Sequence, residues 1–190
     1  MNIAIIPARG NSVRVPRKNV RDFRGKPMLR YPIDVAKASN LFQLVVVSTD
    51  DDEIEQVALD AGAVVTRRAS DDGSKGTQEI ARDVLSHFKT VGMACVVYPC
   101  SPLLSPSLLQ IGRASLNQWR PFSMSVDDRD QDAGCYYFGW RDAFMRKVPL
   151  EDPLTARVRL PAERVCDINT PADWARAESM YDALRRAPCQ

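Results

Sequence analysis

The junction between an apolar run and a basic loop near the N-terminus most constrains how this chain can fold. Residues 3–6 are consecutive apolar residues and predict a buried strand, which ends at Pro7. In the loop that follows, we expect Gly10 to allow a positive φ, which lets backbone N–H groups turn toward an anion. The basic side chains of this loop are those of Arg9, Arg14, Arg17 and Lys18. A strand followed by such a loop is typical of nucleotide-phosphate sites at the carboxyl end of a parallel sheet.

The positive charge of the chain is concentrated in the same region. Residues 1–30 contain eight Lys or Arg against the single acid Asp22, a net charge of +7, whereas the whole chain has +2. Residues 31–190 therefore carry −5. A basic run is often only a solvated face, but this one directly follows the first predicted strand, which favours a polyphosphate site.

The sequence excludes two common phosphate-binding motifs and argues against a nucleic-acid partner. A Walker loop needs Gly-Lys followed by Ser or Thr, whereas Gly25 and Lys26 are followed by Pro27. A dinucleotide fingerprint needs two further glycines near Gly10, and they are missing. The basic residues are not interleaved with aromatic residues at stacking spacing, so no nucleic-acid partner is expected.

Short apolar runs alternate with helical stripes along the chain. Further strands are predicted at residues 44–47, 63–66, 93–97, 122–126 and 135–138, with another extended region between 158 and 165. Helices are predicted between these runs, with Asp50–Asp52, Thr77, Ser105 and the 170–173 capping box at their starts. This pattern predicts a single α/β domain over residues 1–190, with a Rossmann-like, mostly parallel sheet and helices on both faces.

Three helix boundaries carry specific expectations. A helix could start at Pro27, but Pro32 should then kink it or delay its start. Gly62 should stop the helix that follows the acidic cluster. The helix after Ser105 should have Pro106 at its first position and run to about Trp119.

Composition limits the class of protein and the type of metal site. No run approaches the roughly 20 apolar residues of a membrane span, and no signal peptide precedes the first strand, so we expect a cytoplasmic protein with no membrane partner. The five cysteines are scattered without a C-x-x-C pair, which indicates reduced, structural thiols. Because His87 is the only histidine, any metal must be held by carboxylates, which favours Mg²⁺.

One long motif resembles a known family. Residues 6–19 read Ile-Pro-Ala-Arg-Gly-Asn-Ser-x-Arg-x-Pro-Arg-Lys-Asn, and residues 25–29 read Gly-Lys-Pro-Met-Leu. This stretch resembles the opening of the CMP-sialic acid synthetases (acylneuraminate cytidylyltransferases). The Asp-Ala-Gly-x-x-Tyr segment at 132–137 is similar to the pseudaminic acid branch. The resemblance implies a nucleotide-diphospho-sugar transferase fold and transfer of CMP from CTP to a nonulosonic acid, with release of pyrophosphate.

The resemblance also implies which residues form the site. Arg9 and Lys18 would act on the phosphates, and Asp167 would hold Mg²⁺ together with Asn169. Nucleotide contacts are implied for Ala8, Arg9, Gly10, Asn11, Ser12, Lys18, Asn19, Arg68 and Thr77. Sugar contacts are implied for Tyr98, Ser101, Asp132 and Tyr137. No residue is assigned as the general base.

Three positions depart from the family pattern. Asn11 replaces a usual Gly, Val13 replaces a usual Lys, and Asn169 replaces the second Asp of Asp-Ile-Asp. Asn169 keeps a carbonyl oxygen but loses a charge. The alternative to a metal site is that Asp167 and Asn169 only support the start of the next helix. The departures leave two further readings of the chain: a nucleotidyltransferase for another sugar or alcohol, or a nucleotide-binding protein without turnover.

The largest departure lies between Val126 and Asp132. The family carries an insertion here that pairs subunits, whereas this chain has only the polar residues 127–131. A stable interface typically buries about 1,200–2,000 Å² with an apolar centre, which such a segment cannot supply. We therefore predict a monomer, or a dimer built on another surface, and a more open sugar-acid pocket.

Overall fold

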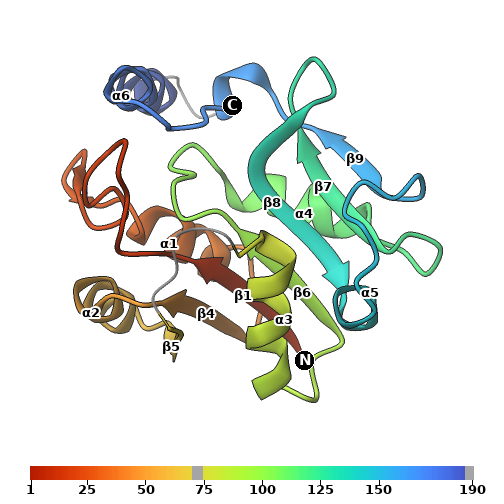
Figure 1. Ribbon diagram of the computed structural model, residues 1–190. Helices are drawn as coiled ribbons and strands as arrows, with labels where there is room; N and C mark the ends of the chain where they lie inside the picture. Colours follow the sequence, from red (N-terminus) through yellow and green to blue (C-terminus); the bar gives the residue numbers. More distant parts are fainter. Residues whose placement is uncertain (70–74, 187–190) are drawn as a thin grey trace.

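A seven-stranded sheet forms the centre of the molecule in the computed structural model, which describes residues 1–69 and 75–186 (Figure 1). Its strands are β1 (Asn2–Pro7), β4 (Leu44–Thr49), β5 (Val64–Arg67), β6 (Met93–Val97), β7 (Phe122–Val126), β8 (Asp132–Trp140) and β9 (Ala156–Arg159). The order across the sheet is β5-β4-β1-β6-β8-β7-β9. A small hairpin of β2 (Asp22–Phe23) and β3 (Lys26–Pro27) lies apart from it. Part of the predicted 67–76 loop and Cys189 lie outside the described residues.

The predicted mostly parallel sheet is confirmed. β1 pairs in parallel with β4 on one side and β6 on the other, so that Ile5 lies opposite both Val46 and Val96. The pairs β4–β5 and β7–β9 are also parallel, whereas β8 runs antiparallel to both β6 and β7. The carboxyl ends of β1, β4, β5 and β6 therefore meet at one edge, where the basic loop leaves β1.

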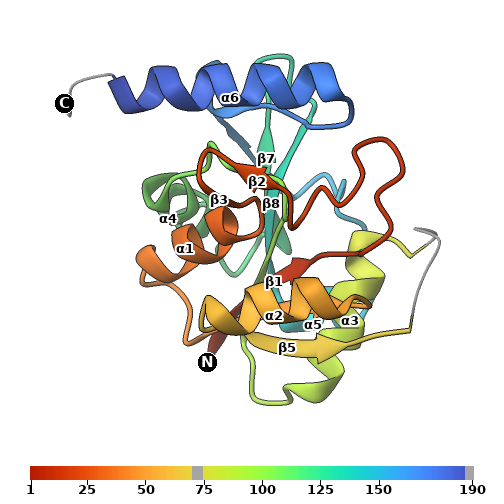
Figure 2. The same ribbon diagram turned by 90° about the vertical axis from the view of Figure 1, so that its left-hand side faces the viewer.

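Helices cover both faces of the sheet, as predicted. One face packs against α1 (Arg30–Ala38), α2 (Asp52–Asp60) and α4 (Pro106–Ala114), and the other against α3 (Thr77–His87) and α5 (Arg141–Met145). The alternation of β1 divides its side chains between the two faces, because Ala4 and Ile6 join the first core and Ile3 and Ile5 the second. The last helix, α6 (Pro171–Arg186), lies across the molecule beside β2 and β3 (Figure 2).

Several predicted helix signals are confirmed. Asp51 caps α2 by accepting a hydrogen bond from the Ile54 N–H at 3.0 Å, and Gly62 follows that helix with a φ of +69°. In the capping box of α6, the Asp173 carboxylate accepts from the Thr170 N–H at 2.8 Å. The Thr170 hydroxyl accepts in return from the Asp173 N–H at 3.2 Å.

The delayed start expected from Pro32 is confirmed, because α1 starts at Arg30 and Pro32 falls in its first turn, where a backbone N–H would have no helical partner. Other boundaries differ from the prediction. Thr77 is the first residue of α3 and does not cap it, because Gly76 holds the capping position. The helix after Ser105 ends at Ala114 instead of near Trp119.

Three features of the second half were not anticipated in the sequence. The region expected to be extended between 158 and 165 is a strand only as far as Arg159, and Ala162–Arg164 form a 3-10 helix. β8 begins at Asp132, three residues before the expected start, because its first residues pair with the end of β7. The short helix α5 was not predicted. Within the described residues, none of the helices combines the length and apolar character that crossing a membrane requires.

Candidate nucleotide-binding site

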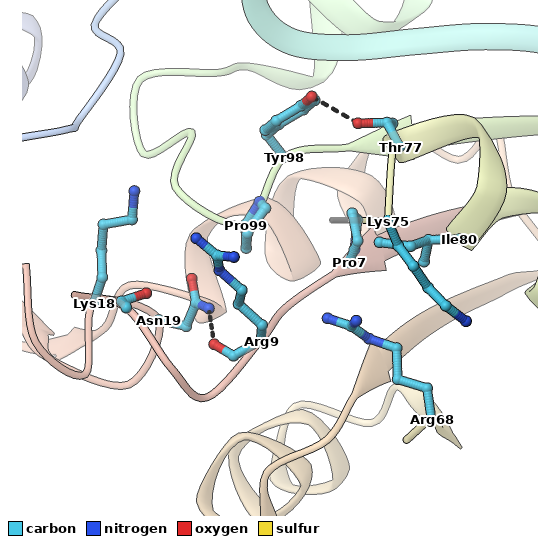
Figure 3. A pocket seen from close by; sticks show the side chains of 11 residues that line it. Pro7, Arg9, Lys18, Asn19, Arg68, Lys75, Thr77, Ile80, Tyr98 and Pro99 are labelled. Carbon is cyan, nitrogen blue, oxygen red and sulfur yellow. Dashed lines mark hydrogen bonds between the residues drawn. The ribbon is translucent and has the colours of Figure 1, made fainter. Parts of the chain in front are cut away.

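A cavity of about 240 Å³ lies at the edge of the sheet where β1, β5 and β6 end (Figure 3). It is lined by Pro7, Arg9, Ser12, Lys18, Asn19, Arg68, Lys75, Thr77, Ile80, Tyr98 and Pro99. Six of the predicted nucleotide contacts are among these residues. Ala8, Gly10 and Asn11 belong to the same loop but do not line the cavity. Lys75 was missed by sequence reasoning, although its charge beside a glycine just before α3 is a recognisable signal.

The start of the loop is held against the end of β4. The Gly10 N–H donates to the Asp50 carboxylate at 2.9 Å. A Cβ on Gly10 would lie 2.5 Å from an Asp51 carboxylate oxygen, so glycine is required here for close approach. The expected positive φ is wrong, because the described glycines with positive φ are Gly25, Gly62 and Gly134.

Arg17 fixes the far side of the loop and does not line the cavity. Its guanidinium forms an ion pair with Asp51, with one hydrogen bond of 3.0 Å, and a second pair with Glu53. These carboxylates raise the pKa of Arg17, and Arg17 in turn holds the pKa of Asp51 below its ordinary value. Of the four basic side chains in the loop, Arg17 therefore binds to the start of α2, whereas Arg9 and Lys18 line the cavity.

Lys18 connects the loop to a segment 150 residues away. Its ammonium group donates to the Ile168 carbonyl at 2.6 Å. This contact brings Asn169 beside Arg9 and Ser12 around a small hollow of about 30 Å³ that adjoins the loop. The predicted phosphate residues and the predicted metal residues are therefore neighbours in space.

Asp167 and Asn169 are the candidates for a metal site. The Asn169 side-chain amide donates to the Asp167 carboxylate, and Asp167 is exposed. The helix-start role belongs mainly to Asp173, which accepts from the backbone N–H groups of Asn169 and Thr170 at 3.1 and 2.8 Å. No group of three or more His, Cys, Asp or Glu suited to a metal ion occurs in the described part of the chain. One carboxylate and one amide fit Mg²⁺ only if nucleotide phosphates and water complete its coordination.

The adjacent arginines 67 and 68 have different environments. Arg67 is exposed and pairs with Asp52 and Glu55, each at 3.0 Å. Arg68 is half-buried, and burial lowers its pKa; the nearby carboxylate of Asp50 opposes this shift, and the charge of Arg9 adds to it. Figure 3 shows the Arg9 and Arg68 side chains extending into the same cavity. Two guanidinium groups brought together in this way favour an anionic ligand.

Of the four predicted sugar residues, Tyr98 lines the cavity, whereas Ser101, Asp132 and Tyr137 do not. Tyr98 forms a 2.8 Å hydrogen bond between its hydroxyl and that of Thr77. Its ring meets the Tyr137 ring edge-on, with centroids 5.7 Å apart. Tyr137 is buried and donates its hydroxyl to Asp132, and burial strongly raises the Tyr137 pKa. Ser101 is also buried.

The segment between β7 and β8 is a closed polar turn. The Asp127 N–H donates to the Gln131 carbonyl at 2.8 Å, and the Asp127 carboxylate accepts from the N–H groups of Arg129 and Gln131. Asp130 pairs with Arg157 of β9 at 2.7 Å. As predicted, this segment is a compact turn without an apolar side chain.

Fold and cavity together define the class: an α/β protein with a cavity lined by Arg and Lys side chains at the carboxyl end of its first strand. A family model described as Cytidylyltransferase matches residues 3–129. Two pseudaminic acid cytidylyltransferases of Campylobacter jejuni are 32% and 33% identical, each over 95% of this chain and 96% of its own length. The chain belongs to the cytidylyltransferase family and is an enzyme of the nucleotidyltransferase type.

Solved structures support the same fold. The structure of CMP:2-keto-3-deoxy-manno-octonic acid synthetase complexed with CTP matches 96% of this chain and 99% of its own, with a TM-score of 0.74 and 16% identity. A cytidylyltransferase from Leptospira borgpetersenii matches 94% of this chain and 85% of its own, with a TM-score of 0.77 and 17% identity. The Campylobacter matches extend over 222 residues, more than the 190 of this chain, so those relatives contain segments that it lacks.

Proposed function

We propose that this protein is a CTP-dependent cytidylyltransferase that activates a nonulosonic acid, of the pseudaminic or sialic acid type, to its CMP-sugar. One observation carries the substrate class: the relatives named pseudaminic acid cytidylyltransferase match 95% of the chain, including its second half. A 3-deoxy-manno-octulosonate cytidylyltransferase of Coxiella burnetii is 38% identical but matches only 56% of the chain. An N-acylneuraminate cytidylyltransferase of Danio rerio likewise matches only 56% of the chain, so the coverage favours the pseudaminic type among these sugar acids.

The reaction needs positive charge around the phosphates. The anomeric hydroxyl oxygen of the sugar acid forms a bond to the α-phosphorus of CTP, and the bond from that phosphorus to the bridging oxygen of pyrophosphate breaks. Arg9, Lys18 and Arg68 supply positive groups around one cavity, where they bind the triphosphate and stabilise the charge that develops on it. Lys18 also holds the 167–169 segment beside the loop through its bond to Ile168.

Mg²⁺ is the metal that the donor set fits. Asp167 would hold the ion, with Asn169 offering its side-chain oxygen, and phosphate oxygens would provide further ligands. When bound, the ion neutralises charge on the phosphates.

A pyrophosphate-release assay tests this function. The four nucleoside triphosphates are each combined with pseudaminic, legionaminic, N-acetylneuraminic and 3-deoxy-manno-octulosonic acids. The expected result is release with CTP and one of the three nonulosonic acids. Release that requires another nucleotide, or that occurs only with the octulosonic acid, contradicts the proposal.

The short β7–β8 turn favours one alternative, a nucleotidyltransferase for a different sugar or alcohol. Without an inserted lobe, fewer contacts position the acceptor, so the acceptor KM should be high even for the correct sugar acid. If CTP binds but none of the four acids supports release, a panel of neutral sugars and alcohols becomes the decisive test of this alternative.

A further inference from the structure

A chain of two hydrogen bonds joins the loop after β6 to the backbone of the nucleotide loop. The Cys100 thiol donates to the Asn19 side-chain oxygen at 3.3 Å. The Asn19 amide nitrogen donates to the Arg9 carbonyl at 2.9 Å. Asn19 is only 4% exposed, and its backbone carbonyl accepts from the Leu29 N–H at 2.8 Å. Asn19 therefore connects three segments that are distant in the sequence.

The Arg9 carbonyl determines which way the Asn19 amide faces, because a carbonyl oxygen can only accept. With its amide nitrogen toward Arg9, Asn19 turns its side-chain oxygen toward Cys100. Burial raises the pKa of Cys100 to about 12, and the nearby Lys18 charge only partly offsets this. The thiol therefore keeps its hydrogen at neutral pH and donates it to that oxygen. The flipped amide would place its oxygen against the Arg9 carbonyl oxygen and lose that bond.

We propose that Cys100 is a positioning residue for nucleotide binding: through Asn19 it holds the backbone of Arg9, and so directs the arginine side chain into the cavity. This differs from the purely structural role expected for the cysteines of this chain. It also gives Asn19, predicted as a nucleotide contact, a second task within the protein. The inference rests on the proposed function in one respect: CTP, the proposed substrate, is the ligand used to test it.

Calorimetric titration with CTP of matched cysteine variants tests the proposal. Cys100→Ala removes the donor and should weaken CTP binding about 3- to 10-fold, the usual range for one hydrogen bond. Cys100→Ser keeps a donor and should stay within about threefold of the wild type. The control is Cys95→Ala: Cys95 is fully buried in β6, and its thiol donates to the adjacent Val96 carbonyl, at 3.6 Å.

The Cys95→Ala control separates an effect on the position of Arg9 from an effect on the stability of the protein. Cys95→Ala should lower the melting temperature at least as much as Cys100→Ala, because Cys95 is the more buried thiol, yet leave CTP affinity unchanged. Equal CTP affinity in Cys100→Ala and the wild type overturns the proposal. So does a loss of affinity in Cys95→Ala that matches the loss in Cys100→Ala.

A measurement without CTP distinguishes failure of the Cys100 proposal from failure of the proposed function. In ¹⁵N NMR spectra of the ligand-free protein, Cys100→Ala should shift the Asn19 side-chain amide and the backbone amides of Arg9 and Gly10, and Cys100→Ser should restore them. Unchanged signals in Cys100→Ala contradict the positioning role. If the wild type does not bind CTP, the proposed function fails, and these spectra still decide the role of Cys100.

Discussion

The loop of residues 8–19 and the turn of residues 127–131 both follow strands of the same sheet and both are rich in charge, but they are held in different ways. The loop depends on partners far along the chain, since Gly10 bonds to Asp50 and Lys18 to Ile168. The turn is closed mainly by its own atoms, through the bonds of Asp127 to Gln131.

This difference explains why the turn can be short without changing the cavity at the edge of the sheet. A turn stabilised by local bonds can change length without moving the sheet edge where β1, β5 and β6 end. The loop has no such independence, because its shape is set by three other segments of the chain. Substitutions in the loop should therefore affect CTP binding, and substitutions in the turn should not.

Arg9→Ala should have the largest effect. It removes charge-assisted hydrogen bonds to the phosphates, each worth about 1.5–3 kcal/mol, so CTP affinity should fall roughly 10- to 150-fold. Calorimetric titration measures the change. Arg24→Ala is the matched control, since Arg24 pairs with Asp182 at 2.8 Å and does not line the cavity. An unchanged dissociation constant and intact turnover would remove the phosphate role of Arg9.

Lys18→Met should rank second. It removes one charge from the cavity and releases the Ile168 carbonyl, so CTP affinity should fall about 10-fold. Lys26→Met is a suitable control, because Lys26 pairs with Asp34 away from the cavity. A comparable loss of affinity in both variants would show a general effect of charge, contrary to the specific link described above.

Asn169→Asp, unlike the two preceding substitutions, should strengthen binding, in this case the binding of Mg²⁺. It restores a second carboxylate beside Asp167, so the half-saturating Mg²⁺ concentration should fall, by about 10-fold for 1.4 kcal/mol of added binding. Activity against Mg²⁺ concentration is measured for both proteins. If the two curves coincide, Asn169 does not contribute to a metal site, and the helix-start role is favoured.

The ion pair of Asp51 predicts a small dependence of stability on pH. Arg17 lowers the Asp51 pKa from 3.8, so its contribution is present above about pH 4 and is lost as pH falls through the depressed value. The pair is partly exposed, so the contribution should be at most about 1 kcal/mol. Urea unfolding of the wild type and Asp51→Asn, which keeps a capping oxygen, should differ at pH 6 and converge near pH 2. A gap that stays constant with pH contradicts the assignment.

Asp130→Ala in the turn should have the smallest effect. It removes an exposed ion pair with Arg157, so the free energy of unfolding should fall by less than about 1 kcal/mol, and CTP affinity should not change. Light scattering should show a monomer, or a dimer whose interface avoids residues 126–135. A dimer centred on those residues, or a loss of CTP affinity in Asp130→Ala, would show that the turn is not independent.

The sequence by itself determined the elements and the general place of the site. Apolar periodicity predicted the strands and most of the helices, and short polar residues such as Asp51 and Thr170 marked helix starts, because both signals act over a few residues. The basic loop after the first strand identified an anion site for the same reason. The resemblance in residues 6–19 then assigned roles to Arg9 and Lys18 that local chemistry alone could not.

Only the tertiary structure decided which side chains meet. Arg17 and Lys18 are adjacent basic residues, yet one pairs with Asp51 and the other bonds to Ile168. The thiol of Cys100 reaches Asn19, 81 residues earlier, although the cysteines looked merely structural in the sequence. Such partners depend on the order of the strands, because β1 lies between β4 and β6 and the loops that leave them converge. Strand order is a property of the whole packed chain, and no local pattern of residues encodes it.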